Sequence, residues 1–172
     1  MSLRILVCGD VEGKYAELYK RVSTIQKKQK DFDMLLCVGE FFSENPASIA
    51  EFKKYQSGEL KAPIATFILG PLKPELDLFY LNNLDGGELA ENIFHFGRSG
   101  IYVGSSGLKI AYLSGADANK AITSGKNLPH VFYQEDIERL ETQIKADTKW
   151  VIASAHIARD DAQTLDTINC FP

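Results

Sequence analysis

The chain has 172 residues, of which 45% are hydrophobic and 24% are charged, and its formal net charge at pH 7 is −4. This composition is that of a globular protein long enough to bury a core. The acidic balance excludes a globally basic nucleic-acid-binding protein, so any RNA contact would have to use a local patch. No apolar run approaches the length of a membrane span, and we expect a single domain over 1–172 with no membrane partner.

Short apolar runs alternate with helical patterns in the first half of the chain. The run from Asp33 to Val38 is nearly all apolar, as in a parallel strand that is covered on both faces. Further along, Pro46 stands where proline suits the first turn of a helix. These patterns predict strands over 3–8, 33–38 and 63–69, and helices over 14–30, 46–55 and 74–81.

Beyond the turn-rich residues 85–87, closely spaced β segments are separated by glycines, which is typical of an antiparallel meander. The meander is predicted to use residues 93–96, 101–103 and 108–113. A helix over 133–146 and a strand over 150–154 follow, and 157–172 is predicted to be a tail or loop. This order of elements predicts an α/β domain built of layers.

The three cysteines, Cys8, Cys37 and Cys170, are odd in number and widely spaced. Cys8 and Cys37 lie inside apolar strand patterns, so we expect reduced, buried thiols in a cytosolic or nuclear protein. No pair of cysteines has the spacing of a zinc site.

Ligands of parallel α/β sheets bind beyond the carboxyl ends of the strands, where loops lead into helices. Asp10, Glu12 and Glu40 follow predicted strands and would converge at that edge, giving oxygen ligands suited to Mg²⁺ or Mn²⁺. His156 follows the strand predicted over 150–154 and is a fourth candidate metal ligand.

Each of these acids also has a structural interpretation. Asp10 suits the N-cap of the helix that follows it. Glu12 suits a solvated position in the first turn, where the helix dipole stabilises an acid. For Glu40, a ligand position and a structural position both stay open.

The histidines carry less information. A lone residue such as His156 is usually structural or exposed, although its place after a strand suits a metal donor. His95 stands in the alternation Ile-Phe-His-Phe and is predicted on the polar face of a strand, while His130 gives no clear signal.

Two cationic residues are candidates for contact with phosphate or another anion. Arg98 lies in Gly97–Gly100, whose backbone amides would suit an anion, although a tight hairpin turn explains the same pattern. Lys73 follows the end of the strand predicted over 63–69, at the same edge of the sheet as the candidate acids.

Several motifs together resemble the CwfJ family of cwf-nineteen-like proteins, and the likeness is collinear over roughly residues 3–116. The motifs are Gly9–Lys14, Leu35–Phe42, Lys61–Ile64, Glu88–Ile93, Phe96–Ile101, Gly104–Leu108 and Tyr112–Gly115. This family is similar to the lariat-debranching enzyme, one of the calcineurin-like metallophosphoesterases. The resemblance implies a four-layer αββα sandwich and a link to pre-mRNA splicing and intron-lariat debranching.

The resemblance also implies an altered metal site. Asp10 matches the first metal-binding aspartate of the phosphoesterase pattern, Glu12 stands where that pattern has histidine, and Glu40 stands where it has the bridging aspartate. Residues 70–73, Gly-Pro-Leu-Lys, replace Gly-Asn-His-Glu. His156 lies near a later histidine ligand, and the terminal Gly-His-x-His motif has no counterpart, which implies a C-terminally truncated sandwich.

The first hypothesis is therefore a pseudoenzyme with no catalytic residues and no expected cofactor. It would bind splicing or lariat-debranching proteins of the spliceosome in the nucleus, with weak or indirect RNA contact. We also expect self-association, because a truncated second sheet would expose an uncovered edge.

Two alternatives remain at this stage. One is an active phosphoesterase on RNA or nucleotides that uses Mn²⁺ or Mg²⁺ bound by Asp10, Glu12, Glu40 and His156, with metal-bound hydroxide as the nucleophile. The other is a plain α/β fold in which these acids only cap helices.

Overall fold

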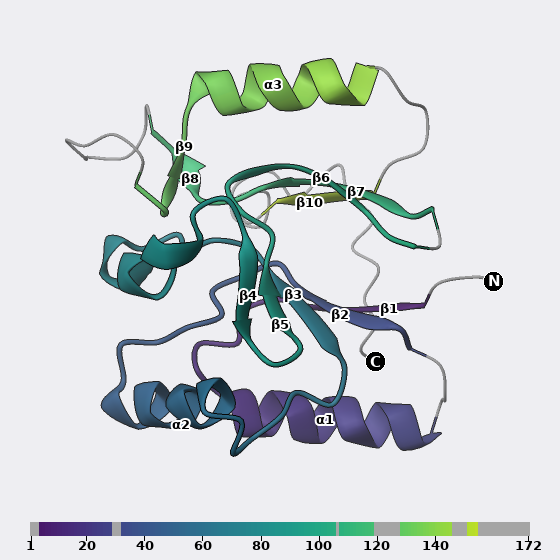
Figure 1. Cartoon of the computed structure of the whole chain (residues 1–172), viewed down its shortest axis with the longest axis vertical. Coiled ribbons are helices and arrows are strands. Elements are labelled where there is room, and N and C mark those ends of the chain that lie inside the picture. The colour runs from purple at the N-terminus through teal and green to yellow at the C-terminus, as the bar shows by residue number, and fades with distance from the viewer. Residues whose placement is uncertain (1–3, 29–31, 106, 119–127, 146–150, 155–172) are drawn as a thin grey trace.

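The computed structural model of the chain describes residues 4–28, 32–105, 107–118, 128–145 and 151–154. Two sheets lie between helices, with α1 and α2 below the first sheet and α3 above the second (Figure 1). The helices are α1 (Tyr15–Lys28), α2 (Pro46–Gln56) and α3 (Gln134–Lys145). The predicted α/β layering is therefore confirmed.

The first sheet contains the predicted parallel strands. Its order is β1-β2-β3-β5-β4, and β4 alone runs antiparallel to its neighbour. The strands are β1 (Ile5–Cys8), β2 (Met34–Cys37), β3 (Ala65–Ile68), β4 (Gly87–Ala90) and β5 (Ile93–His95). All four residues of β2 are buried, as the apolar run predicted for a strand covered on both faces.

The two helices below the first sheet bury one face each. Tyr15 and Tyr19 of α1 recur at helical spacing and are buried, as are Phe52 and Tyr55 of α2. At the start of α2, the Asn45 side chain accepts a hydrogen bond from the Ala47 N–H at 2.9 Å, and proline occupies the first turn as predicted.

Aromatic rings fill the space between the two sheets. Phe67 of β3 stacks on Phe94 and on Phe96, with ring centroids 5.2 and 5.1 Å apart. Phe96 in turn stacks on Tyr112 of the second sheet at 4.9 Å. This packing joins the two sheets and fixes where their strand ends lie relative to each other.

The second half of the chain differs from the predicted meander. Residues 93–95 form β5, which pairs in parallel with β3 in the first sheet. Of the runs predicted for the meander, only those in β6 (Ser99–Val103) and β7 (Lys109–Leu113) pair with each other as an antiparallel hairpin, and β10 (Val151–Ser154) lies parallel to β7. The meander prediction failed because glycine-separated runs show where strands end but not which sheet each strand joins.

Shorter elements lie between successive strands of each sheet. The helix predicted over 74–81 is instead two 3₁₀ segments, η1 (Pro74–Phe79) and η2 (Leu81–Asn83). A short parallel pair, β8 (Ala116–Asp117) with β9 (Val131–Phe132), leads into α3. Within the described ranges, no helix is both long enough and apolar enough to cross a bilayer. The predicted tail 157–172 and His156 lie outside the described residues.

Candidate functional site

The loops that follow β1 and β2 are joined by their backbones. The N–H groups of Val11 and Glu12 donate to the carbonyl oxygen of Glu40 at 2.8 and 2.9 Å, and the Gly13 N–H donates to the Phe41 carbonyl at 3.0 Å. Glu12 has a φ of +49°, an uncommon conformation for a residue other than glycine. Two of the three predicted strand ends are thus held side by side.

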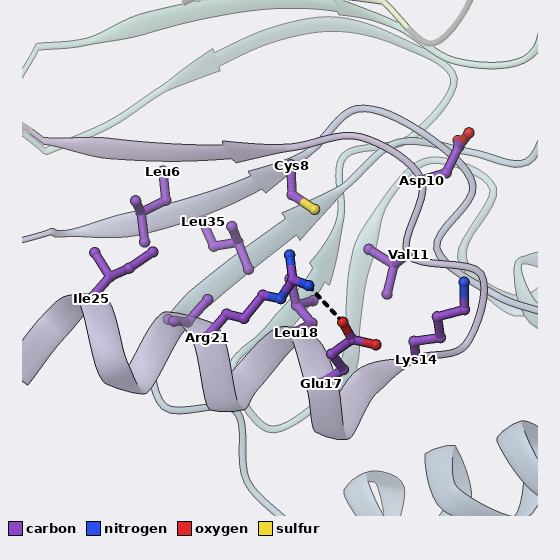
Figure 2. A pocket seen from close by; sticks show the side chains of 11 residues that line it. Leu6, Cys8, Asp10, Val11, Lys14, Glu17, Leu18, Arg21, Ile25 and Leu35 are labelled. Atoms are coloured by element: carbon purple, nitrogen blue, oxygen red, sulfur yellow. Dashed lines mark hydrogen bonds and ion pairs between the residues drawn. The ribbon is translucent and has the colours of Figure 1, made fainter. Parts of the chain in front are cut away.

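Asp10 contributes a side-chain link between the same loops. Its Oδ1 accepts a hydrogen bond from the Glu40 N–H at 2.8 Å. The carboxylate points away from α1 in Figure 2, and that helix begins only at Tyr15. The N-cap interpretation of Asp10 is therefore not what the structure shows, because the acceptor serves a neighbouring loop.

Glu40 is a buried acid, with only 5% of its surface exposed. Its Oε1 accepts a hydrogen bond from the Leu72 N–H, whereas Oε2 is buried with no partner among the described residues. Burial raises the pKa of Glu40, against the opposing effects of the Leu72 N–H and the Lys73 charge; Asp10 and Glu12 raise it further. The shift favours the neutral carboxyl group over the anion.

Glu12 and Lys73 are exposed and border one open pocket of about 240 Å³. Glu12 precedes α1 instead of lying in its first turn, where the acidic residue is Glu17. The pocket is lined by Glu12, Phe42, Ser43, Glu44, Lys73 and Leu76. Of the residues predicted for the site, the structure thus gathers Asp10, Glu12, Glu40 and Lys73 at one edge of the first sheet.

Arg98 does not line this pocket. Its guanidinium lies over the ring of Tyr133, 5.5 Å from the centroid, and its Nε is buried without a hydrogen-bond partner among the described residues. Its predicted contact with an anion stays a prediction.

His95 is buried, contrary to its predicted position on a polar face. Its Nδ1 donates to the Asn83 carbonyl oxygen at 2.9 Å, and its ring lies edge-on to Tyr80. Burial lowers the pKa of His95 to about 4, so the imidazole is neutral at neutral pH. The alternation of residues along the strand could have predicted this burial, because Ile93 is two residues away and lies on the same buried face.

A second histidine, His130, is also buried, and no sequence pattern predicted its position. His130 Nδ1 and Asp77 Oδ2 are hydrogen-bonded at 2.7 Å, and this bond ties η1 to the segment before β9. Burial raises the pKa of Asp77, while the hydrogen bond to His130 opposes that shift. The far atoms of both groups, His130 Nε2 and Asp77 Oδ1, are buried without partners among the described residues.

The third strand end lies beside this buried polar region. A Cβ atom on Gly70 would approach His95 Nε2 and the Pro129 carbonyl oxygen to 3.4 Å, and Ser114 Cβ to 3.0 Å. Only a residue without a side chain fits here without displacing these neighbours. The next two residues, Pro71 and Leu72, carry no side-chain donor atom.

The donor set does not fit a two-metal centre. Such a centre needs an ionised bridging carboxylate and several nitrogen or oxygen donors. One oxygen of Asp10 and one of Glu40 already accept hydrogen bonds from backbone N–H groups. Across the part of the chain that the structure describes, no three His, Cys, Asp or Glu side chains are grouped so as to hold an ion.

Comparison with known proteins identifies relatives. The model of the calcineurin-like phosphoesterase family matches residues 3–169. CWF19-like protein 1 of Homo sapiens is 53% identical over 116 residues, which are 67% of this chain and 21% of that protein. CWF19-like protein 1 of Mus musculus is 47% identical over 142 residues, covering 83% of this chain and 25% of the relative.

The likeness extends to invertebrates. The CWF19-like protein 1 homolog of Drosophila melanogaster is 40% identical over 134 residues, which are 78% of this chain and 24% of that protein. The chain thus spans about a quarter of the length of these relatives. The resemblance to cwf-nineteen-like proteins that the motifs predicted is confirmed.

Proposed function

This chain belongs to the calcineurin-like phosphoesterase family, and from that premise we propose that it is a degenerate member that binds proteins or ribonucleoproteins instead of hydrolysing phosphate esters. The observation that carries the proposal is the use of its strand-end acids. Asp10 and Glu40 each accept a hydrogen bond from a backbone N–H group, and these bonds hold the loops together.

The setting that we propose is pre-mRNA splicing or intron-lariat debranching in the nucleus. Its support is the similarity to CWF19-like protein 1 from several animals. Partners would then be splicing or debranching proteins, with RNA contacted weakly or through those proteins.

Two exposed apolar side chains on the 3₁₀ segments are candidates for contact with a protein partner. Leu78 and Leu81, on η1 and η2, expose 62% and 58% of their surfaces. They follow closely after Leu76, which lines the pocket beside Glu12. Exposed apolar side chains favour protein contact, so we propose that the binding surface includes these two residues.

A capture experiment tests the proposed interaction. The immobilised chain is incubated with nuclear extract, and splicing and debranching proteins are quantified by mass spectrometry. We expect the wild type to recover them and the double variant Leu78→Asp/Leu81→Asp to lose them. Val103→Asp is the matched control, because Val103 is 59% exposed and ends β6, at the opposite side of the view from the 3₁₀ segments (Figure 1). Failure of the wild type to recover these proteins in repeated captures contradicts the proposal.

An active phosphoesterase is the second candidate, and one observation favours it. Glu40 Oε2 is buried and has no partner among the described residues, so it would suit one bound cation. Hydrolysis of bis(p-nitrophenyl) phosphate and of a 2′–5′ branched RNA is measured with and without Mn²⁺. We expect rates equal to those of the Asp10→Ala variant. Mn²⁺-dependent hydrolysis that this substitution abolishes would establish the enzyme.

A further inference from the structure

A second pocket lies on the other side of the β1 loop, between β1 and α1. Its volume is about 210 Å³, and it is lined mainly by apolar side chains of the two elements, including Leu6, Leu18 and Ile25. Figure 2 shows Cys8 of β1 among these lining side chains. The Cys8 thiol is half-buried and reduced, so a small solute that enters the pocket can reach it.

A second thiol lies directly beside the first. Cys8 of β1 pairs in register with Cys37 of β2. Neighbouring strands are about 4.8 Å apart, and the Cα atoms of disulfide-bonded cysteines are about 4.4–6.8 Å apart. Cys37 has no exposed surface, so solutes reach this pair only through Cys8.

The pocket also provides a positive charge. Arg21 of α1 lines it, and its guanidinium pairs with Glu17 at 2.8 Å. A thiol that shares an open pocket with an arginine is the kind that reacts with oxidants.

We propose that Cys8 is a peroxide-reactive thiol whose oxidised form is captured by Cys37 as a disulfide within the first sheet. This proposal does not depend on the proposed binding function. The two cysteines differ in access, so their roles differ: Cys8 reacts with the oxidant, and Cys37 reacts only with the product on Cys8.

The reaction has two steps. The Cys8 thiolate attacks one oxygen of hydrogen peroxide, the O–O bond breaks, and hydroxide leaves and takes up a proton to give water. Cys8 becomes a sulfenic acid. The Cys37 sulfur then attacks the Cys8 sulfur, the S–O bond breaks, and water leaves with the Cys37 proton as the S–S bond forms. Two thiols lose two electrons in total, and one peroxide is reduced to two waters.

The test uses the full chain with Cys170→Ser, because Cys170 lies outside the described residues and would add a third thiol. The folded protein is treated with one equivalent of hydrogen peroxide, and its products are measured by intact and peptide mass spectrometry. We expect the loss of two hydrogens and a Cys8–Cys37 cross-linked peptide. With Cys37→Ser, a sulfenic acid on Cys8 is trapped by dimedone, and with Cys8→Ser neither product forms.

A charge variant tests the role of the pocket. Arg21→Gln is expected to slow alkylation of Cys8 by monobromobimane at pH 7 by about three- to tenfold. Lys20→Gln is the matched control, because Lys20 is an exposed cation of α1 that does not line the pocket. The proposal is overturned if Cys8 reacts no faster than in the urea-unfolded chain, or if the oxidised protein contains no Cys8–Cys37 bond.

Discussion

The carboxylate of Asp10 accepts the backbone N–H of Glu40, with 2.8 Å between Oδ1 and N, and so links the ends of two neighbouring parallel strands. Asp10, the first acid of the expected metal site, therefore has a structural role that needs no metal. Its consequence is a measurable contribution to the stability of the loops at this edge.

Asp10→Ala is expected to lower the free energy of unfolding by about 1 kcal/mol, because the Glu40 N–H loses its acceptor. Asp10→Asn keeps an oxygen at Oδ1 and is expected to cost less. Urea denaturation monitored by circular dichroism measures both changes. Glu12→Ala is the control at an exposed position, where a change of no more than about 0.5 kcal/mol is expected. Equal stabilities of Asp10→Ala and the wild type would show that the link contributes nothing.

The contribution of Glu40 to the free energy of unfolding is expected to decrease as pH rises. Burial raises its folded pKa above the ordinary value of 4.5. Its contribution is therefore complete below pH 4.5 and is lost as pH rises through the folded pKa. Glu40→Gln is expected to remove this slope while keeping an oxygen for the Leu72 N–H. Urea midpoints between pH 4.5 and 8 check this, with the exposed Glu44→Gln as a control that retains the slope.

His95 acts in the opposite direction. Its folded pKa of about 4 lies below the ordinary value of 6.5. The stability that it contributes is complete above pH 6.5 and is lost as pH falls towards 4, by about 3 kcal/mol. His95→Gln is expected to abolish this loss. Imidazole proton resonances provide an independent check, because His95 is expected to stay neutral at pH 5.5 in the folded protein. Titration of His95 near pH 6.5 would contradict the prediction.

The effects of substitutions at His130 and Asp77 on the free energy of unfolding are expected to be strongly coupled. His130→Ala leaves a largely buried carboxyl group without its partner and is expected to cost about 3 kcal/mol. Adding Asp77→Ala to that variant is expected to cost less than Asp77→Ala alone, with a coupling energy of about 1–3 kcal/mol. The exposed Arg21–Glu17 pair is the reference, with an expected coupling of about 0.5 kcal/mol or less. Additive effects at His130 and Asp77 would refute the coupling.

Much of the first sheet could be predicted from local patterns. The all-apolar run of β2 and the proline at the start of α2 each identify their element within a few residues. Because parallel strands place their carboxyl ends at one edge, the meeting of Asp10, Glu12 and Glu40 also follows from the order of elements.

The details of the site could not be predicted in the same way. The bond between Asp77 and His130 joins residues far apart in the chain, and no periodicity encodes such a pair. The hydrogen bond and the opposite charge near Glu40 come from Leu72 and Lys73, which belong to another loop. The sheet that β5 joins depends on packing of Phe67 against Phe94 and Phe96, not on the glycines beside the strand.

The lengths of the connections in the second sheet predict the order in which its strands pair. Its central strand, β7, pairs with β6 through a local hairpin but with β10 only through a crossover that includes α3. Closing the longer connection costs more chain entropy, so we expect β10 to pair with β7 after β6 does and to detach from it before β6 does. In native-state hydrogen exchange, we therefore expect the β7 amides that face β6 to exchange slowly and the β7 amides that face β10 to exchange faster.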